Sequence, residues 1–217
     1  MRIITGIYKG RRFDIPRSFK ARPTTDFAKE NIFNVLNSYI DLEGVRALDL
    51  FAGTGSISLE LLSRGCSQVV SVEADRDHAR FIGECVRKLG VTNHQLIRGD
   101  VFRYLKSAQK SSTLTRGSAA LPLEHSGEAA LNAAQQHLNR DAVAIERGSA
   151  AFSFIFADPP YALPNLPDIP DLVLQSGILA PGGVFVFEHG KQNDFSSHPC
   201  FREHRAYGSV NFTIFTT

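Results

Sequence analysis

The 217-residue chain has no tryptophan, one methionine and only three cysteines. The cysteines are odd in number and widely spaced, so they predict neither a disulfide framework nor a zinc ribbon; they are Cys66, Cys85 and Cys200. The seven histidines are also scattered, without the spacing of metal ligands. We therefore expect no metal, and a reducing compartment.

Long apolar runs are absent too. The longest, such as residues 184–187, are far too short to cross a bilayer, and no apolar segment like that of a signal peptide follows the basic N-terminus. Apolar residues still make up 43% of the chain, which is enough for a hydrophobic core at this length. We expect a cytoplasmic protein without membrane contact, and a monomer as the simplest state.

Basic residues concentrate at the start of the chain. Residues 1–30 hold eight basic residues against three acids, a net charge of +5, whereas the whole chain carries +2. The remaining residues are therefore slightly acidic. This asymmetry predicts a polyanionic partner that meets the N-terminal end, with a solvated charged segment as the alternative.

From residue 46 onward, short apolar runs alternate with helix-like stretches, which is typical of a parallel sheet covered by helices. We predict strands at residues 46–51, 68–73, 94–98, 152–157 and 184–188. Helices are predicted at residues 56–64, 76–89 and 172–177, with a short turn from 101. A final hairpin, residues 201–207 and 211–215, would close one edge of the sheet with an antiparallel pair.

Two further regions flank or interrupt this core. Residues 2–15 predict two short strands, and residues 25–39 a helix capped by Thr24 or Thr25. Residues 107–150 are rich in alanine, serine, glutamine and asparagine, and we interpret them as an insertion that includes an amphipathic helix near residues 131–145. The predicted organisation is an N-terminal region, 1–40, and a core, 41–217, that contains the insertion.

A glycine turn follows the first core strand directly. Phe51, Gly53 and Gly55 lie where nucleotides bind in doubly wound folds, and the two glycines permit a tight turn and a close approach of a ligand to the backbone. Glu73 ends the next strand, where a carboxylate can accept from both ribose hydroxyls. The turn suits a dinucleotide or S-adenosylmethionine, although Ser58 stands where a dinucleotide fingerprint has a smaller residue.

Acidic residues at the strand ends favour the second cofactor. Asp49, near the end of the first strand, could face the ammonium group of a methionine moiety but would repel a pyrophosphate. Asp100 follows the third strand and could accept from an adenine amino group, or it could cap a helix that begins at Val101. Asp49, Glu73 and Asp100 together suit a cationic adenosyl ligand.

The most specific motif is Asp158-Pro159-Pro160-Tyr161, directly after an apolar strand. Its two prolines fix the backbone and leave the Asp158 carboxylate and the Pro159 carbonyl as paired acceptors. An amino group on a planar base fits this pair, which would turn the nitrogen lone pair toward an electrophilic methyl group while Tyr161 stacks on the ring. The alternative is a strand that ends in prolines and an exposed tyrosine.

These motifs resemble those of the amino-group methyltransferases that use S-adenosylmethionine. The N-terminal part narrows the resemblance to the bacterial 16S ribosomal RNA guanine-N2 methyltransferase family, on residues 2–6, 9–11, 22–26, 33–34 and 207–208. The resemblance implies an α/β, Rossmann-like fold of seven strands with an N-terminal β-hairpin and helix extension. It also implies that the hairpin contacts RNA and that a guanine in a loop is methylated, in the small subunit or its assembly intermediate. Thr5, where a glycine is common, and the insertion depart from the pattern.

On this interpretation the residues divide into three groups. The catalytic group is Asp158, Pro159, Pro160 and Tyr161. The S-adenosylmethionine-binding group is Asp49, Phe51, Gly53, Gly55, Glu73, Asp100 and Val101. The RNA-binding group is Arg2, Lys9, Arg11, Arg12, Arg22 and Asn34. Arg22 could instead only pair with Asp26, and Asn34 could cap the helix or face solvent.

Two other functions fit the same motifs less well. One is methylation of adenine N6 in DNA or of a protein amide, which the Asp158–Tyr161 motif alone does not exclude. The short basic N-terminal region and the lack of room for a target-recognition domain weigh against it. The other is a catalytically silent RNA-binding assembly factor, which the intact Asp49, Gly53, Gly55 and Asp158 argue against.

Overall fold

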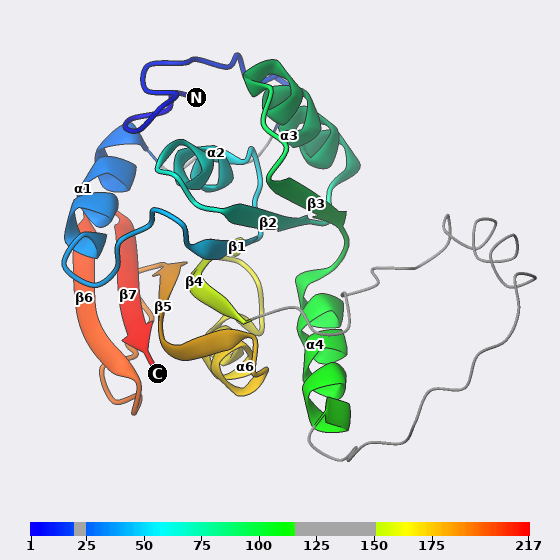
Figure 1. The fold of residues 1–217 in the computed structure, drawn as a ribbon. Coiled ribbons are helices and arrows are strands. Elements are labelled where there is room, and N and C mark those ends of the chain that lie inside the picture. Colours follow the sequence, from blue (N-terminus) through cyan, green and yellow to red (C-terminus); the bar gives the residue numbers. More distant parts are fainter. Residues whose placement is uncertain (20–24, 116–150) are drawn as a thin grey trace, which may run out of the picture.

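The computed structural model describes residues 1–19, 25–115 and 151–217, and shows a seven-stranded sheet with helices on both faces (Figure 1). The strands are β1 (Arg46–Leu50), β2 (Gln68–Glu73), β3 (His94–Arg98), β4 (Phe152–Ala157), β5 (Leu179–His189), β6 (Phe201–Tyr207) and β7 (Val210–Thr216). The helices are α1 (Asp26–Leu36), α2 (Ser56–Ser63), α3 (Arg76–Leu89), α4 (Val101–Thr115), the short 3₁₀ helix η2 (Leu166–Asp168) and α6 (Ile169–Gln175).

The order of strands in the sheet is β3-β2-β1-β4-β5-β7-β6. The strands from β3 to β5 pair in parallel, and β7 is antiparallel to both β5 and β6, which confirms the predicted edge hairpin. The chain moves outward in one direction from β1 to β3 and in the other from β4 to β5. Ligands bind at such a switch point in open α/β sheets, beyond the carboxyl ends of the strands.

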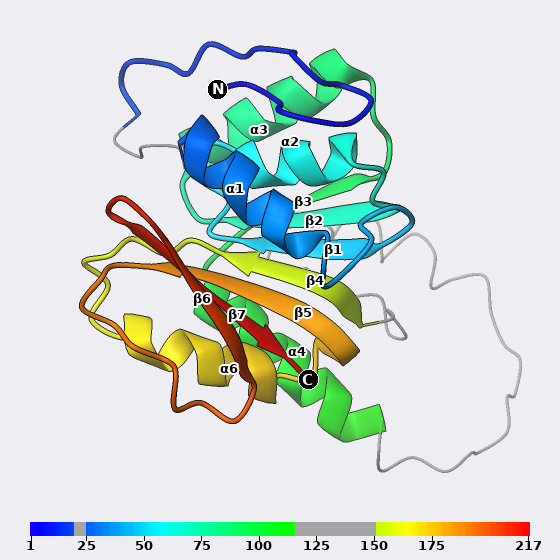
Figure 2. The same cartoon turned by 90° about the vertical axis from the view of Figure 1, so that its left-hand side faces the viewer.

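Two apolar layers cover the sheet (Figure 2). Helices α1, α2 and α3 pack on one face, and α4 and α6 on the other. Strand β1 shows how alternation serves both layers, because Ala47 belongs to the first cluster and Leu48 and Leu50 to the second. Both faces of the central strands are thus buried, as expected for a parallel sheet.

Local signals explain where two of the helices begin and end. Thr25 caps α1, since its Oγ1 accepts from the backbone N–H of Ala28 at 3.2 Å, which confirms one of the two predicted caps. Asp75 caps α3 by accepting from the N–H groups of Asp77 and His78, and Gly90 ends that helix in the left-handed conformation at φ 71°. The bounds of α3 agree with the prediction.

The N-terminal residues differ from the prediction. Of the two strands expected in residues 2–15, a short antiparallel pairing is present: Arg2 bridges to Arg12, the N–H of Ile3 donates to the carbonyl of Arg11 at 3.0 Å, and the carbonyl of Ile3 accepts from the N–H of Gly10 at 2.9 Å. The backbone N–H groups of Ile4 and Thr5 donate to the carboxylate of Glu60 on α2, so they take a side-chain partner where a strand would take a backbone one. Residues 4–8 therefore lie along α2, and the short hairpin stays outside the seven-stranded sheet.

Other element boundaries also differ. Helix α4 has 15 residues where a short turn was expected, and it extends into the predicted insertion. Helix α1 ends at Leu36, three residues before the predicted end, and Tyr39 just after it donates its hydroxyl to Glu203 of β6 at 2.7 Å. Helix α6 begins at Ile169, ahead of the expected 172, because Pro170 fits its first turn.

Two further expectations concern the insertion and the membrane. The amphipathic helix predicted near residues 131–145 lies outside the described residues. Within residues 1–19, 25–115 and 151–217, no helix is both long enough and apolar enough to span a membrane.

Candidate active site

The glycine turn connects β1 to α2 at the switch point of the sheet. Gly53 and Gly55 have positive φ angles of 55° and 74°, and Phe51 also has a positive φ, 61°, which is uncommon for a residue with a side chain. A Cβ atom on Gly55 would lie 2.9 Å from Cγ1 of Ile82 in α3. The turn therefore needs glycine at position 55 both for its conformation and for close packing.

Glu73 holds this turn against the next strand end. Its Oε2 accepts from the N–H of Gly53 at 2.6 Å, and its Oε1 accepts from the N–H of Asp75 at 2.7 Å. The side chain is nearly buried. Each carboxylate oxygen has a second lone pair, so Glu73 keeps acceptor capacity for hydroxyl groups of a ligand while it fixes the turn.

Asp49 lies on the α2 side of β1 and is buried. Its Oδ2 accepts from both the N–H and the hydroxyl of Ser58, at 3.0 and 2.5 Å. A chain of hydrogen bonds continues from Ser58 through Ser71 to Nε2 of His94. Burial raises the pKa of Asp49 to about 7, against the effect of the Ser58 hydrogen bonds. The contact of this carboxylate with a methionine ammonium stays a prediction.

Asp100 caps a helix, which is one of the two roles that the sequence left open for it. Its Oδ1 accepts from the N–H of Arg103 at 2.9 Å, so it caps α4 from an exposed position. Val101 begins that helix and is buried in the apolar layer under the sheet. A contact of Asp100 with adenine through its remaining acceptor capacity stays a prediction.

The Asp158–Tyr161 motif leaves β4 beside the glycine turn. Leu50 pairs with Ala157, and the N–H of Asp158 donates to the carbonyl of Leu50 at 3.4 Å, so Phe51 and Asp158 leave neighbouring strands at the same level. Pro159 is buried and Pro160 is exposed. The structure thus brings together the two motifs, which lie about one hundred residues apart in the sequence.

Tyr161 has a partner that the sequence did not reveal. Its hydroxyl donates to Oε1 of Glu188 on β5 at 3.0 Å, while 39% of the residue stays exposed. Burial and the neighbouring Glu188 and Asp158 carboxylates raise the pKa of Tyr161 above its usual value, so the hydroxyl is a donor at neutral pH. Glu188 therefore orients a tyrosine that remains partly exposed.

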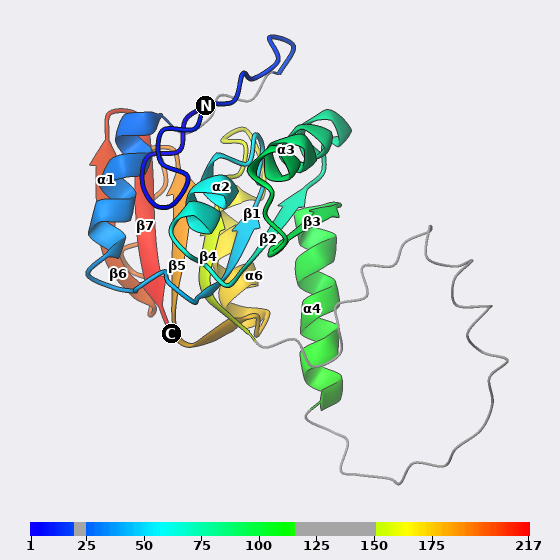
Figure 3. The same cartoon turned by 45° about the horizontal axis from the view of Figure 1, so that its top comes forward.

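Two of the predicted RNA-binding residues, Arg2 and Arg12, line a cavity of about 490 Å³ between the N-terminal segment and the starts of α1 and α2. It is lined by Met1, Arg2, Arg12, Phe13, Asp14, Thr25, Asp26 and Ser56. Ser56 follows Gly55 directly, so the cavity borders the glycine turn. Figure 3 shows the first residues of the chain lying between α1 and α2 at this edge.

The predicted RNA-binding residues differ in their exposure, their partners and their distance from the cavity. Arg2 is half-exposed and pairs with Asp26 at 3.1 Å, and Arg11 donates to the carbonyl of Lys88 at 3.3 Å. Lys9 and Arg12 are exposed, whereas Arg22 lies outside the described residues. Asn34 is exposed too, but it lies eight residues along α1 from Asp26, or about 12 Å by helical rise, so it is remote from the cavity.

Two buried charges beneath this segment were missed by sequence reasoning. Lys29 of α1 and Glu60 of α2 are 1% and 0% exposed and face each other at 3.7 Å. Each lies on the face of its helix that apolar neighbours mark as buried. A charged residue on a predicted apolar face is therefore the one sequence signal that could have found them. In the described parts of the chain, no group of three or more potential metal ligands is present.

The fold and the named relatives identify the protein as a methyltransferase. The glycine turn, Glu73 and the Asp158–Tyr161 motif meet at one edge of a seven-stranded sheet of this type. The chain belongs to the family described as "Conserved hypothetical protein 95", whose model matches residues 1–116 and 119–216.

Two relatives carry methyltransferase names, and a solved structure shares the fold. "Putative rRNA methyltransferase YlbH" of Bacillus subtilis is 32% identical over 193 residues, 88% of this chain and 84% of that protein. "Ribosomal RNA small subunit methyltransferase D" of Escherichia coli K12 is 34% identical over 112 residues, 52% of this chain and 54% of that protein. A hypothetical protein of Thermus thermophilus superposes with a TM-score of 0.72 at 26% identity, covering 100% of this chain and 99% of that one.

Proposed function

We propose that this protein transfers a methyl group from S-adenosylmethionine to the exocyclic N2 of a guanine in a loop of 16S ribosomal RNA. The observation that carries the proposal is the placement of Asp158 beside the glycine turn, through the pairing of Leu50 with Ala157. The names of the relatives support ribosomal RNA as the substrate, and the motif supports an amino group as the acceptor.

The chain offers a cradle that fits the cofactor. Gly53 and Gly55 present backbone without side chains at the start of α2, and Glu73 supplies carboxylate acceptors at the end of β2. Asp49, Phe51, Asp100 and Val101 complete the set that we assign to cofactor binding. When bound, S-adenosylmethionine supplies an electrophilic methyl group.

The catalytic residues orient the amine. The Asp158 carboxylate and the Pro159 carbonyl accept its two N–H groups, so the nitrogen lone pair turns away from the base ring. Pro160 helps to fix this backbone, and Tyr161, held by Glu188, stacks on the ring. Positioning of the two reactants supplies most of the rate, and the nitrogen loses a proton after the new bond forms.

The N-terminal region, residues 1–40, binds the RNA backbone in this proposal, and residues 41–217 form the methyltransferase core. Arg2, Lys9, Arg11, Arg12 and Arg22 contact phosphates, whereas the position of Asn34 makes it the weakest member of the set. The target guanine is looped out, because a base inside a duplex is out of reach. We place the reaction in the cytoplasm, on small-subunit particles, with a monomeric enzyme.

Radiolabelled S-adenosylmethionine and unmodified small ribosomal subunits test this function. The product is hydrolysed to nucleosides, and Asp158→Ala is assayed in parallel. The proposal predicts N2-methylguanosine with the native protein and not with the variant. N6-methyladenosine, a methylated protein or no product at all would contradict it.

A further inference from the structure

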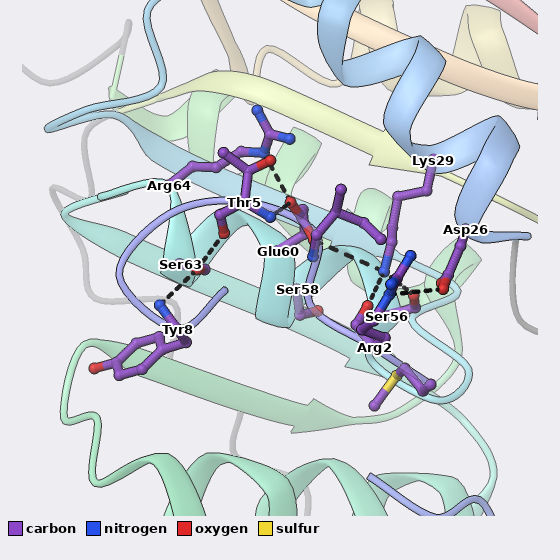
Figure 4. A network of polar contacts seen from close by, with 12 residues as sticks. Arg2, Thr5, Tyr8, Asp26, Lys29, Ser56, Ser58, Glu60, Ser63 and Arg64 are labelled. Carbon is purple, nitrogen blue, oxygen red and sulfur yellow. Dashed lines mark hydrogen bonds and ion pairs between the residues drawn. The ribbon is translucent and has the colours of Figure 1, made fainter. Parts of the chain in front are cut away.

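The backbone of residues 2–8 is attached to α2 by a cluster of buried polar groups (Figure 4). Glu60 is fully buried, and each of its carboxylate oxygens accepts from a backbone N–H of the segment. Oε2 accepts from Ile4 at 2.8 Å and Oε1 accepts from Thr5 at 3.0 Å. One side chain of α2 therefore satisfies two successive N–H groups that have no strand partner.

Ser63 makes the second attachment, one helical turn further along α2. Its hydroxyl donates to the carbonyl of Thr5 at 2.5 Å and accepts from the N–H of Tyr8 at 3.0 Å, and its carbonyl accepts from the N–H of Ile7 at 2.8 Å. The segment thus follows the axis of α2 through hydrogen bonds at both Glu60 and Ser63.

Lys29 joins this attachment to the glycine turn. Its ammonium donates to the carbonyl of Arg2 at 2.7 Å and to the hydroxyl of Ser56 at 3.1 Å, and lies 3.7 Å from Oε2 of Glu60. Ser56 is the first residue of α2, directly after Gly55. A single buried ammonium therefore connects α1, the start of α2 and the backbone of Arg2.

Stability alone seldom explains a buried ion pair, because two apolar residues of similar volume often stabilise a fold equally well or better. Here the groups hold backbone rather than only each other. Arg2 is fixed through its carbonyl and bridged to Arg12, and both line the cavity beside the glycine turn. The orientation of the two arginines therefore depends on Lys29 and Glu60.

We propose that Lys29 and Glu60 are positioning residues for RNA binding: their buried ion pair holds residues 2–8 on α2 so that Arg2 and Arg12 face the substrate beside the glycine turn. The proposal rests on the proposed function for the identity of the substrate. It adds that the RNA-binding segment and the cofactor turn share one helix, α2, as their common support.

Two glycines offer a test of the attachment that leaves every charge in place. Gly6 has φ +88°, and a Cβ there would lie 1.8 Å from the carbonyl oxygen of Ser63. Gly10 has nearly the same φ, +83°, with nothing within 4 Å of a Cβ. Both alanine substitutions bring the same kind of backbone strain, but only Gly6→Ala displaces the segment from α2.

Binding is measured by fluorescence anisotropy with a labelled RNA hairpin that has a guanine in its loop, at several salt concentrations. We expect Glu60→Gln, Lys29→Met and Gly6→Ala each to weaken RNA binding by about tenfold or more, and to lower the salt slope toward that of the Arg2→Ala/Arg12→Ala double variant. Gly10→Ala should stay within about threefold of the native protein. S-adenosylmethionine binding, measured by calorimetry, should change by less than about threefold in all of them.

Coupling to the arginines separates positioning from general destabilisation. In the Arg2→Ala/Arg12→Ala background, Glu60→Gln should cause no further loss of RNA affinity, because the residues through which it acts are gone. Val173→Ala, in the apolar layer on the opposite face, serves as a control that destabilises the fold without touching the segment. It should leave RNA binding unchanged.

Hydrogen exchange completes the test. The amides of Ile4 and Thr5 should exchange faster in Glu60→Gln and Gly6→Ala than in Gly10→Ala. If these amides are released and RNA affinity does not change, or if Val173→Ala weakens RNA binding as much as Glu60→Gln, the positioning role is wrong. None of these measurements requires methyl transfer. Failure to form N2-methylguanosine would therefore overturn the proposed function, whereas the RNA-binding and hydrogen-exchange results decide the positioning role separately.

Discussion

The N-terminal segment and the catalytic loop meet the same glycine turn, yet they are held in different ways. Residues 158–161 continue the largely buried strand β4, and their backbone is fixed by the β1–β4 pairing and two prolines. Within residues 2–8, Arg2 and Ile3 pair with residues 10–12, and the segment is held on α2 by a buried carboxylate, a serine and an ammonium. The sheet core therefore positions the catalytic residues, whereas buried polar groups position the RNA-binding segment. Substitutions in the two regions should separate turnover from RNA affinity.

The largest effect is expected at Asp158. Replacement by alanine removes one of the two acceptors of the amine, and we expect kcat to fall by about 10³-fold, roughly 4 kcal/mol of barrier. RNA affinity should stay within about threefold, because the basic segment is intact. Steady-state methylation with labelled cofactor gives kcat, and anisotropy gives the affinity. A variant that turned over normally, or that lost RNA binding, would contradict the separation.

The next effect concerns the pH dependence of stability that the buried Asp49 carboxyl group causes. Asp49 is held by hydrogen bonds from Ser58, and its pKa of about 7 in the folded protein lies above the usual 3.8. The folded state therefore keeps a proton that the unfolded chain releases between about pH 4 and 7, so the free energy of unfolding falls as pH rises through this window. Asp49→Asn keeps an acceptor for Ser58 and should remove this fall, which amounts to at most about 4 kcal/mol.

Urea denaturation of the two proteins at pH 4.5, 6 and 8 measures this difference. The variant should gain stability over the native protein as pH rises, and the two should converge at the acidic end. Parallel curves at all three pH values would show that Asp49 is ionised in the folded state throughout.

Breaking the buried ion pair of the N-terminal region should cost more stability than breaking the half-exposed one. Lys29→Met removes one of the cations beside the buried Glu60 carboxylate, which keeps Arg64 at 3.1 Å, and it also removes the donor to the Arg2 carbonyl and the Ser56 hydroxyl; we expect the free energy of unfolding to fall by about 3 kcal/mol. Asp26→Asn breaks only the half-exposed pair with Arg2 and should cost less than about 1 kcal/mol. Equal costs in urea denaturation would remove the contrast between the two pairs.

The smallest effect on turnover is expected at Tyr161. Tyr161→Phe keeps the ring but loses the hydrogen bond to Glu188, so we expect kcat to fall by about fivefold, near 1 kcal/mol. Tyr39→Phe is the matched control, since it loses a similar bond to Glu203 on the outer strand β6. Both losses of a hydroxyl should have a similar effect on stability, but only the first should change kcat in the methylation assay.

The sequence predicted the sheet well because its signals are local. Strand β2 and helix α3 have the predicted bounds, since alternation, a cap and a terminal glycine all lie within the element itself. The edge hairpin was likewise predicted from Gly208 and Ser209, which separate residues 201–207 from 211–215. The family membership and the methyltransferase class are confirmed by the matching family model and the named relatives.

What escaped prediction depends on contacts between distant segments. The N-terminal hairpin is shorter than expected: residues 1–3 pair with residues 10–13, but Glu60, more than fifty residues away, takes the N–H groups of Ile4 and Thr5. The bond from Tyr161 to Glu188 and the chain from Asp49 to His94 also cross between elements, and no local pattern announces them. The helical continuation of α4 past residue 106 was hidden by a composition typical of loops.

One experiment tests the central claim, that catalysis and RNA binding at this edge are placed independently. Unmodified small subunits are titrated against the native protein, Asp158→Ala and Gly6→Ala, and kcat and KM are read from N2-methylguanosine formation. We predict that Asp158→Ala loses kcat, and that Gly6→Ala raises KM by about tenfold with kcat nearly intact. Loss of kcat in Gly6→Ala with an unchanged KM, or a native product other than N2-methylguanosine, would contradict the account.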